Sequence, residues 1–134
     1  MTAYLLDTNI ASDAIKGTPA RVRERLVALP IHSVAISAVT QGELIYGLAK
    51  RGHPAALSAL IHEFLIRVEV LPWTAEVANV YGALRASCAG RGVSMGALDM
   101  MIAAQAVTAG AILVTRDKAF GHVEQGLKLE DWTS

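Results

Sequence analysis

The chain has 134 residues, of which 53% are apolar and 18% charged, and this composition is typical of one folded domain and excludes a disordered chain. Lys plus Arg number 12 and Asp plus Glu number 12, so the net charge is zero. That balance excludes nucleic-acid binding through a basic field over the whole domain, but it leaves a local basic patch open. The single cysteine, Cys88, cannot form an internal disulfide, and the N-terminus lacks the pattern of a signal peptide. Both features favour a cytoplasmic protein.

Apolar runs and turn residues predict strands that alternate with helices, in one domain over residues 1–134. In chain order, the sequence predicts a strand at 4–6, helices at 9–15 and from Thr18-Pro19 onward, a strand at 34–36, helices at 39–50 and 54–67, a strand at 68–71, helices at 74–91 and 98–109, and strands at 112–114 and 127–129. Thr18 is the expected N-cap of the second helix, and Pro19 fits its first turn. This alternation implies a parallel sheet with helices on both faces.

The stretch 92–115 contains only one charged residue, Asp99, so a membrane span must be considered. Three glycines, several polar residues and the carboxylate near its middle argue against a span. The stretch divides naturally at Ala109-Gly110 into a buried helix and a buried strand. We therefore expect no contact with a membrane.

Four carboxylates lie where apolar, strand-like segments end. Asp7 follows the first strand directly, and Asp117 stands three residues past the strand at 112–114. Glu43 opens a helix shortly after the second strand, and Asp99 lies in the helix that leads into the fourth. Ligands of open α/β sheets bind outside the carboxyl ends of the strands. A carboxylate cluster fed from distant parts of the chain is what a Mg²⁺ or Mn²⁺ site needs, so the pattern predicts metal-assisted chemistry.

Each of these carboxylates also has a purely structural explanation. Asp7 fits the N-cap of the helix that follows it, and Asp117 fits the cap of a short turn. Thr40 and Glu43 have the spacing of a capping box, and the helix dipole favours Asp99 near a helix start. Taken singly, these explanations are at least as good as a functional one.

The four taken together favour the functional interpretation. Asp99 shares a helical face with Ile102, Ala103 and Ala106, and this face should be buried because the helix has almost no polar side. A buried, unpaired carboxylate costs several kcal/mol unless a cation or hydrogen bonds compensate it. No Lys or Arg lies within one turn of Asp99. The other acids are predicted to be solvated surface residues: Asp13, Glu24, Glu63, Glu69, Glu76, Glu124, Glu130 and Asp131.

Four segments carry a resemblance to a known family. They are residues 5–10 (LLDTNI), 37–47 (SAVTQGELIYG), 96–106 (GALDMMIAAQA) and 112–120 (ILVTRDKAF). In this order they resemble the four motifs of PIN domains, and the tail at 126–132 (GLKLEDW) also fits. Within that family the chain resembles the VapC-type toxins of bacterial toxin–antitoxin pairs.

This resemblance implies a three-layer α/β/α sandwich around a mostly parallel sheet of four to five strands. It also implies a Mg²⁺- or Mn²⁺-dependent endoribonuclease that forms a homodimer and is inhibited by a VapB-type antitoxin. By position, the acidic quartet comprises Asp7, Glu43, Asp99 and Asp117. The supporting polar residues carried over from the family are Thr8, Asn9 and Thr115. The ending at 130–132 (EDW) resembles relatives that cut initiator tRNA, so tRNA is the suspected substrate.

Hydrolysis of a phosphodiester needs an activated water and neutralisation of charge on the phosphate, and divalent ions can supply both. Asp7 and Asp99 are expected to be the main metal ligands. Glu43 and Asp117 are assigned to a second ion, to water-mediated contacts or to orientation of the nucleophile. Asn9 and Thr115 are expected to hold the carboxylates in orientation. No histidine lies in the four motifs, which argues against zinc.

Five basic residues are candidates for contact with RNA phosphates. Arg21, Arg23 and Arg25 lie on one short helix, where a solvated helix face is an equally good explanation. Arg116 and Lys118 flank Asp117 and are expected near the mouth of the site.

Two other functions remain open at this point. Phosphatases of the haloacid dehalogenase type also place an Asp after the first strand, but they carry a second Asp two residues on, where this chain has Asn9. A non-catalytic RNA-binding module could keep the same fold, although the intact quartet argues against that reading.

Overall fold

The computed structural model of the protein describes residues 2–124 and 126–134, and in this part of the chain five parallel strands form one sheet in the order β3-β2-β1-β4-β5. The strands are β1 (Tyr4–Leu6), β2 (Val34–Ser37), β3 (Glu69–Leu71), β4 (Ile112–Val114) and β5 (Leu129–Glu130). The helices are α1 (Thr8–Lys16), α2 (Ala20–Ala28), α3 (Ala38–Lys50), α4 (Ala55–Arg67), α5 (Ala75–Gly90) and α6 (Ala97–Ala109). Short 3₁₀ turns, η1 (Ile31–Ser33) and η2 (Lys118–His122), complete the elements.

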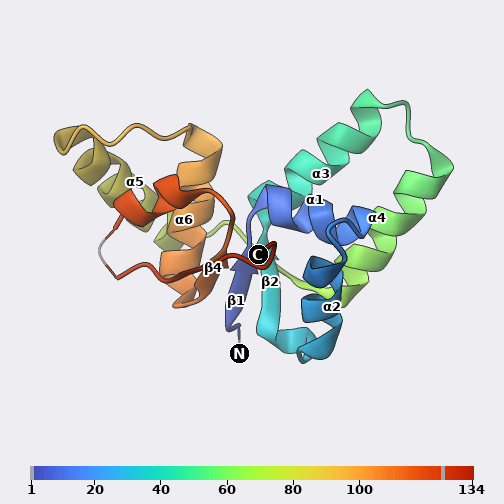
Figure 1. Ribbon diagram of the computed structural model, residues 1–134. Coiled ribbons are helices and arrows are strands. Elements are labelled where there is room, and N and C mark those ends of the chain that lie inside the picture. Colours follow the sequence, from blue (N-terminus) through green and yellow to red (C-terminus); the bar gives the residue numbers. More distant parts are fainter. Residues whose placement is uncertain (1, 125) are drawn as a thin grey trace.

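The sheet separates two apolar cores because successive side chains of a strand point to opposite faces. In β1, Leu6 packs with residues of α1 to α4, whereas Leu5 packs with residues of α5 and α6. β4 repeats this alternation with Val114 on the first face and Leu113 on the second. Figure 1 shows the result, with α1 to α4 on one side of the strands and α5 and α6 on the other. The predicted three-layer α/β/α fold is confirmed, and all the strand pairs are parallel.

The apolar stretch 92–115 folds as the sequence predicts. Helix α6 ends at Gly110, whose φ of 64° closes the helix in the left-handed conformation that glycine adopts without strain. β4 begins two residues later, and Ile102, Ala103 and Ala106 are fully buried. No helix among the residues that the structure describes is both long and apolar enough to cross a membrane.

Three local predictions need correction. Thr18 does not cap α2: its backbone N–H bonds to the Asp13 carbonyl in the turn that closes α1, and the N-cap position is Pro19, without a side-chain cap. The N-cap of α3 is Ser37 and not Thr40, because the helix starts as soon as β2 ends. The last strand lies at Leu129–Glu130 and not at 127–129, since its register is set by pairing with β4.

Candidate active site

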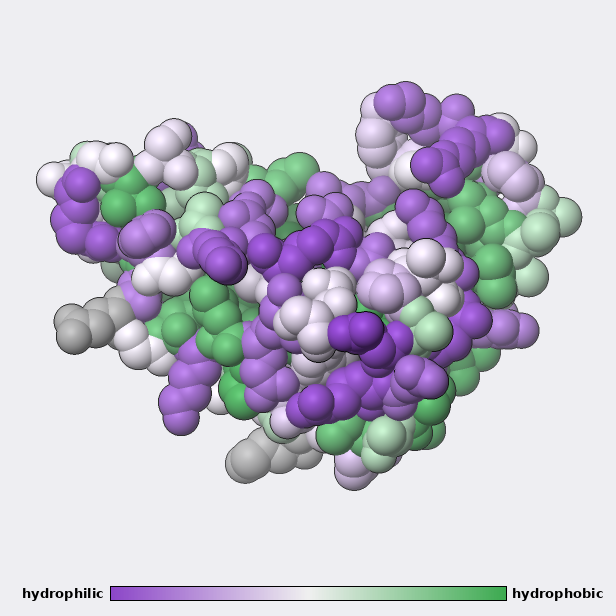
Figure 2. Space-filling model, viewed as in Figure 1, coloured by the Kyte–Doolittle hydropathy of each residue, from purple (hydrophilic) through white to green (hydrophobic). Residues whose placement is uncertain are grey.

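The four acids lie around the point where the strand order reverses, within electrostatic range of Asp99. β1 lies between β2 and β4, and the chain crosses from one side of β1 to the other between β3 and β4. The backbone N–H of Asp7 donates a hydrogen bond to the Val114 carbonyl at 3.0 Å, so the carboxyl ends of β1 and β4 meet at this point. Such a switch point is where open α/β sheets bind their ligands. Figure 2 shows the surface hollowed between α3 and the side formed by α5 and α6.

Asp7 is both the N-cap of α1 and the most buried acid of the quartet. Its side chain is 4% exposed, and Oδ1 accepts a hydrogen bond from the Ile10 backbone N–H at 2.9 Å. Burial raises the pKa of Asp7 above its usual value, and the negative charge of Asp99 adds to that rise. Hydrogen bonds from Thr115 and Ile10 work in the opposite direction. The predicted cap is confirmed, but capping occupies only one of the two carboxylate oxygens.

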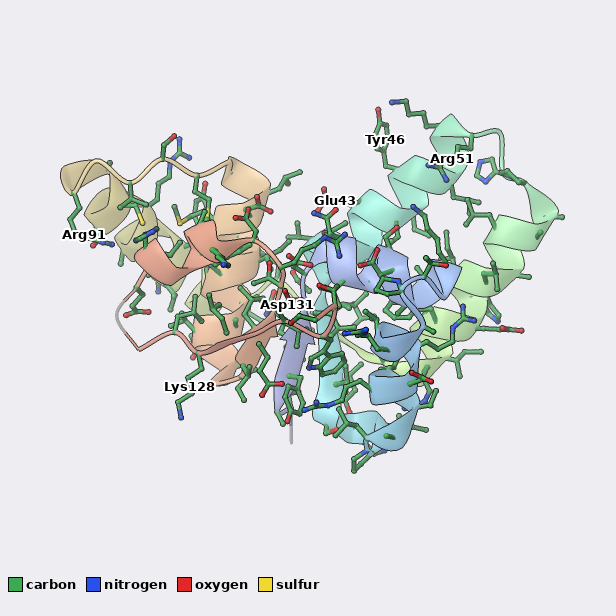
Figure 3. The ribbon with its side chains drawn as sticks, in the orientation of Figure 1. Glu43, Tyr46, Arg51, Arg91, Lys128 and Asp131 are labelled. Atoms are coloured by element: carbon green, nitrogen blue, oxygen red, sulfur yellow. The ribbon has the colours of Figure 1, made fainter. Side chains whose placement is uncertain are left out.

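Glu43 is held by two threonines from different parts of the chain. Its Oε1 accepts a hydrogen bond from the Thr8 hydroxyl at 2.7 Å, and the Thr8 and Thr40 hydroxyl oxygens lie 3.1 Å apart. Thr40 is fully buried in the first turn of α3. The sequence spacing of Thr40 and Glu43 pointed to a capping box, whereas the structure uses the same spacing to place both side chains on the face of α3 that meets Thr8. Thr40 is therefore a site residue that the sequence motif misassigned. Figure 3 shows Glu43 on α3 nearer the sheet, with Tyr46 and Arg51 farther out along the helix.

Asp99 is the electrostatic centre of the quartet. It is half-buried in the first turn of α6 and, among the described residues, forms no hydrogen bond or ion pair through its side chain. Desolvation raises its pKa, and the negative charges of Asp117 and Glu43 raise it further. Because Asp99 also acts on Asp7, it lies within electrostatic range of the other three acids.

Thr115 and Asp117 lie just past the carboxyl end of β4. The Asp117 backbone N–H donates to the Thr115 hydroxyl oxygen at 3.0 Å, and the Asp117 carboxylate caps η2 by accepting from the Ala119 N–H at 2.9 Å. The Thr115 side chain also lowers the pKa of Asp7, so it acts on two members of the quartet. Asn9 is exposed at the start of α1.

Like charges held together in a partly desolvated pocket disfavour the ionised state, and a hard divalent cation would relieve that repulsion. Within residues 2–124 and 126–134, however, no three Asp, Glu, His or Cys side chains converge closely enough to hold a metal ion. Mg²⁺ is usually held by one or two carboxylates and keeps several waters. The residues present therefore fit a partly hydrated ion at Asp7 and Asp99 better than a site closed by protein ligands.

The basic residues near the site have separate partners. Arg116 forms an ion pair with Asp13 of α1, and the contact raises the pKa of Arg116. Asp13 is buried, so its assignment to the solvated surface was wrong: the fold places Arg116 against it. Lys118 is exposed beside Asp117.

The three arginines of α2 do not act as one basic face. Arg23 donates to the carbonyls of Ala14 and Ile15 and so satisfies the end of α1. Arg25 pairs with Glu130 and lies 5.4 Å from the centre of the Trp132 ring. Arg21 is exposed. Of the three, Arg21 has the guanidinium most available to a phosphate.

Comparison with known proteins agrees with this geometry. The family model of the PIN domain matches residues 4–126. The chain is 41% identical over 133 residues to the tRNA(fMet)-specific endonuclease VapC of Shigella flexneri, with 99% of this chain and 100% of the relative covered. It is 36% identical over 132 residues to the tRNA(fMet)-specific endonuclease VapC of Salmonella typhimurium, covering 98% of this chain and 99% of that relative.

Solved structures give the same result. A chain in the crystal structure of DNA-bound VapBC from Salmonella typhimurium matches with a TM-score of 0.90 at 36% identity, covering 98% of this chain and 99% of that one. A chain of VapBC2 from Rickettsia felis, bound to a DNA fragment from the promoter, matches with a TM-score of 0.89 at 32% identity, with the same coverage. The matches favour a ribonuclease over the phosphatase alternative. The chain therefore belongs to the PIN-domain family, among its VapC ribonuclease toxins.

Proposed function

We propose that this VapC-family ribonuclease is a Mg²⁺- or Mn²⁺-dependent endonuclease that cleaves tRNA and is neutralised by a VapB-type antitoxin. The observation that carries the metal dependence is the position of Asp99, which is half-buried and within electrostatic range of Asp7, Glu43 and Asp117. Among residues 2–124 and 126–134, it has no basic partner. A cation at this point would remove the repulsion and attract the phosphate of the substrate.

In this proposal Asp7 and Asp99 hold the ion, and Glu43 and Asp117 contact it through water or orient the attacking water. When bound, the ion polarises a phosphoryl oxygen and lowers the pKa of a coordinated water. The chain's own residues fix the carboxylates: the Thr8 hydroxyl holds Glu43, the Ile10 N–H holds Asp7, and the Ala119 N–H holds Asp117. Thr115 accepts from the Asp117 backbone N–H and lowers the pKa of Asp7. Asn9, exposed beside them, is proposed as a further polar support for the carboxylates or the substrate.

The proposal of tRNA as substrate rests on the relatives of Shigella flexneri and Salmonella typhimurium, both named for cleavage of tRNA(fMet). Lys118 and Arg21 are the exposed cations proposed to contact RNA phosphates. Arg116 is a weaker candidate because it is already paired with Asp13.

The direct test uses protein purified free of antitoxin. It should cut tRNA in Mg²⁺ or Mn²⁺ and stop when EDTA is added, and sequencing of RNA ends after brief induction should give one dominant site. Asp99→Asn purified in parallel controls for contaminating nuclease. Cleavage that persists in EDTA would contradict the metal mechanism.

The antitoxin proposal rests on the solved VapBC structures that the chain resembles. We expect an amphipathic antitoxin helix to occupy an apolar groove and to place a basic side chain in the acidic pocket. Antitoxin affinity should then fall as Mg²⁺ rises, and it should be weaker for Asp99→Asn than for the wild type. Affinity that is independent of both changes would place inhibition away from the pocket.

A further inference from the structure

A buried glutamine joins the two helices that carry Asp99 and Glu43. Gln105 lies in α6, six residues after Asp99, and is 3% exposed. Its Oε1 accepts a hydrogen bond from the Ser37 hydroxyl at 3.0 Å, and its Nε2 donates to the Pro72 carbonyl at 3.3 Å. One side chain therefore connects α6 with the junction of β2 and α3 and with the segment that follows β3.

Ser37 is fixed from both directions. Its hydroxyl is fully buried and, while it donates to Gln105, its oxygen accepts from the Val39 backbone N–H at 3.0 Å as the N-cap of α3. Buried polar groups are strongly penalised when they lose their partners, so the contact between Gln105 and Ser37 favours a single arrangement of the two helices.

Helix α6 is held by apolar packing and by a polar connection to its neighbours. In the described part of the chain, Gln105 makes the only side-chain hydrogen bonds between α6 and other elements, since the Thr108 hydroxyl bonds within the helix. The other buried residues of α6 are mostly apolar and include Met100, Ile102, Ala103, Ala104 and Ala106. Apolar burial is not directional, so the hydrogen bonds of Gln105 add a directional constraint on the position of the helix.

The contact is the same number of residues away from two acids of the site. Glu43 is six residues from Ser37 along α3, and Asp99 is six residues from Gln105 along α6. At 1.5 Å per residue, each carboxylate is about 9 Å along its helix from the Gln105–Ser37 contact. A tilt of either helix at this contact would change the separation of Asp99 and Glu43. The ribbon in Figure 1 shows α3 and α6 diverging on opposite sides of the central strands.

We propose that Gln105 is a positioning residue for RNA cleavage, which fixes the separation of Asp99 and Glu43 through its hydrogen bond to Ser37. This inference rests on the proposed function, in which Asp99 would hold the ion and Glu43 would contact it through water or orient the attacking water. It adds a residue outside the acidic pocket that determines whether the pocket has its productive shape. A misplacement of about 1 Å can lower a rate about 100-fold, so a single buried contact at the base of both helices can control activity.

The test compares Gln105→Leu, which keeps the size of the side chain but removes the hydrogen bonds, with Ala104→Gly. The glycine variant destabilises the same helix but leaves Gln105 and Ser37 in place. Ser37→Ala breaks the contact from the other side, whereas Ser37→Thr retains the hydroxyl. All four are compared as folded protein below their melting temperatures.

Three properties are measured. The first is the distance distribution between spin labels at Tyr46→Cys on α3 and Leu98→Cys on α6, both exposed positions, in a Cys88→Ala background with labelled chains diluted in unlabelled protein. The second is Mn²⁺ affinity by calorimetry without RNA. The third is the separation of kcat from KM for RNA.

Gln105→Leu and Ser37→Ala should broaden or shift the spin-label distance, weaken Mn²⁺ binding about tenfold and lower kcat about 100-fold, with KM within about twofold. Ala104→Gly and Ser37→Thr should keep wild-type values. If Gln105→Leu does not fold, Ser37→Ala decides the question. Wild-type distances and kcat in the variant that folds would overturn the proposal. A wild-type protein that neither binds Mn²⁺ nor cleaves RNA would instead contradict the proposed function, and the spin-label distances would still test the Gln105–Ser37 contact.

Discussion

The Thr8 hydroxyl donates a hydrogen bond to Oε1 of Glu43 across 2.7 Å, although the two residues are 35 positions apart in the chain. Because the single hydroxyl proton of Thr8 is used in this bond, the Thr40 hydroxyl must be the donor in its 3.1 Å contact with Thr8. A chain of hydrogen bonds therefore runs from Thr40 through Thr8 to Glu43. Since Thr8 directly follows Asp7, the carboxyl end of β1 supplies one acid of the site and orients another.

Thr8→Val should lower cleavage about 10- to 100-fold, because Glu43 loses the group that holds it. Unfolding free energy should fall by about 1–3 kcal/mol, since the buried Thr40 hydroxyl loses its acceptor. Thr8→Ser keeps the hydroxyl and should retain most activity. The comparison requires kcat and urea unfolding for both variants. Activity that is kept in Thr8→Val but lost in Thr8→Ser would show that the methyl group, and not the hydrogen bond, matters.

Asp7→Asn and Asp99→Asn should each abolish cleavage and toxicity without unfolding the protein. At position 7 the amide oxygen of Asn can still accept from the Ile10 N–H. Desolvation, and after it the repulsion between carboxylates, raises both pKa values, and loss of one negative charge relieves both costs. Melting temperatures in EDTA should therefore equal or exceed that of the wild type. A marked loss of stability in both variants would mean that the carboxylates serve mainly as structural caps.

Stability in the absence of metal should fall as pH rises through the titration of Asp7 and Asp99. Burial raises the pKa of each carboxyl in the folded state above its usual value, so between the unfolded and the folded pKa of each group the native protein binds more protons than the unfolded chain. The unfolding free energy then decreases with pH in that window, and the contribution is fully present only below the unfolded pKa. Thermal melts in EDTA from pH 4 to 7 should show a smaller decline for Asp99→Asn than for the wild type. Identical slopes would rule out a contribution from Asp99.

Arg23→Ala should lower the stability of the protein without changing its binding or cleavage of RNA. Its guanidinium satisfies two carbonyls at the end of α1, so its removal should lower the unfolding free energy by about 1–3 kcal/mol with kcat and KM unchanged for the folded enzyme. Arg21→Ala and Lys118→Ala should instead raise KM for tRNA and weaken its salt dependence, with little change in stability. The measurements are urea titrations and steady-state kinetics at two salt concentrations. A raised KM for Arg23→Ala alone would reverse these assignments.

The protein should form a homodimer, because a short chain that is 53% apolar leaves hydrophobic helix faces uncovered. The predicted surface includes either the helix at 54–67 or the start of the helix after Trp73. In the structure, α4 exposes Leu60 and 68% of Ile66. Ile66→Lys should shift light scattering at tens of micromolar from dimer to monomer, whereas Ile45→Lys, at an exposed position on α3, should not. A wild-type monomer would contradict the prediction, and a dimeric Ile66→Lys would move the interface to the helix after Trp73.

Local sequence determined most of the fold and the identity of the four acids. Strand alternation places Leu5 and Leu6 in different cores because pleating turns successive side chains to opposite faces. The break at Gly110 follows from the left-handed conformation that ends α6. Asp7 could be placed at a strand end, and Asp99 on a largely buried helix face, from periodicity alone.

Only the tertiary structure decided what the acids and their neighbours contact. The partners of Glu43, Arg116 and Gln105 lie 35, 103 and 68 positions away, and no local period specifies contacts over such separations. The arginines of α2 illustrate the same limit, because sequence spacing places them on one helix but does not show that Arg23 turns inward to the end of α1. Local dihedral preferences act within a turn or two, whereas these contacts arise when the strand order β3-β2-β1-β4-β5 brings the carboxyl ends of β1 and β4 together.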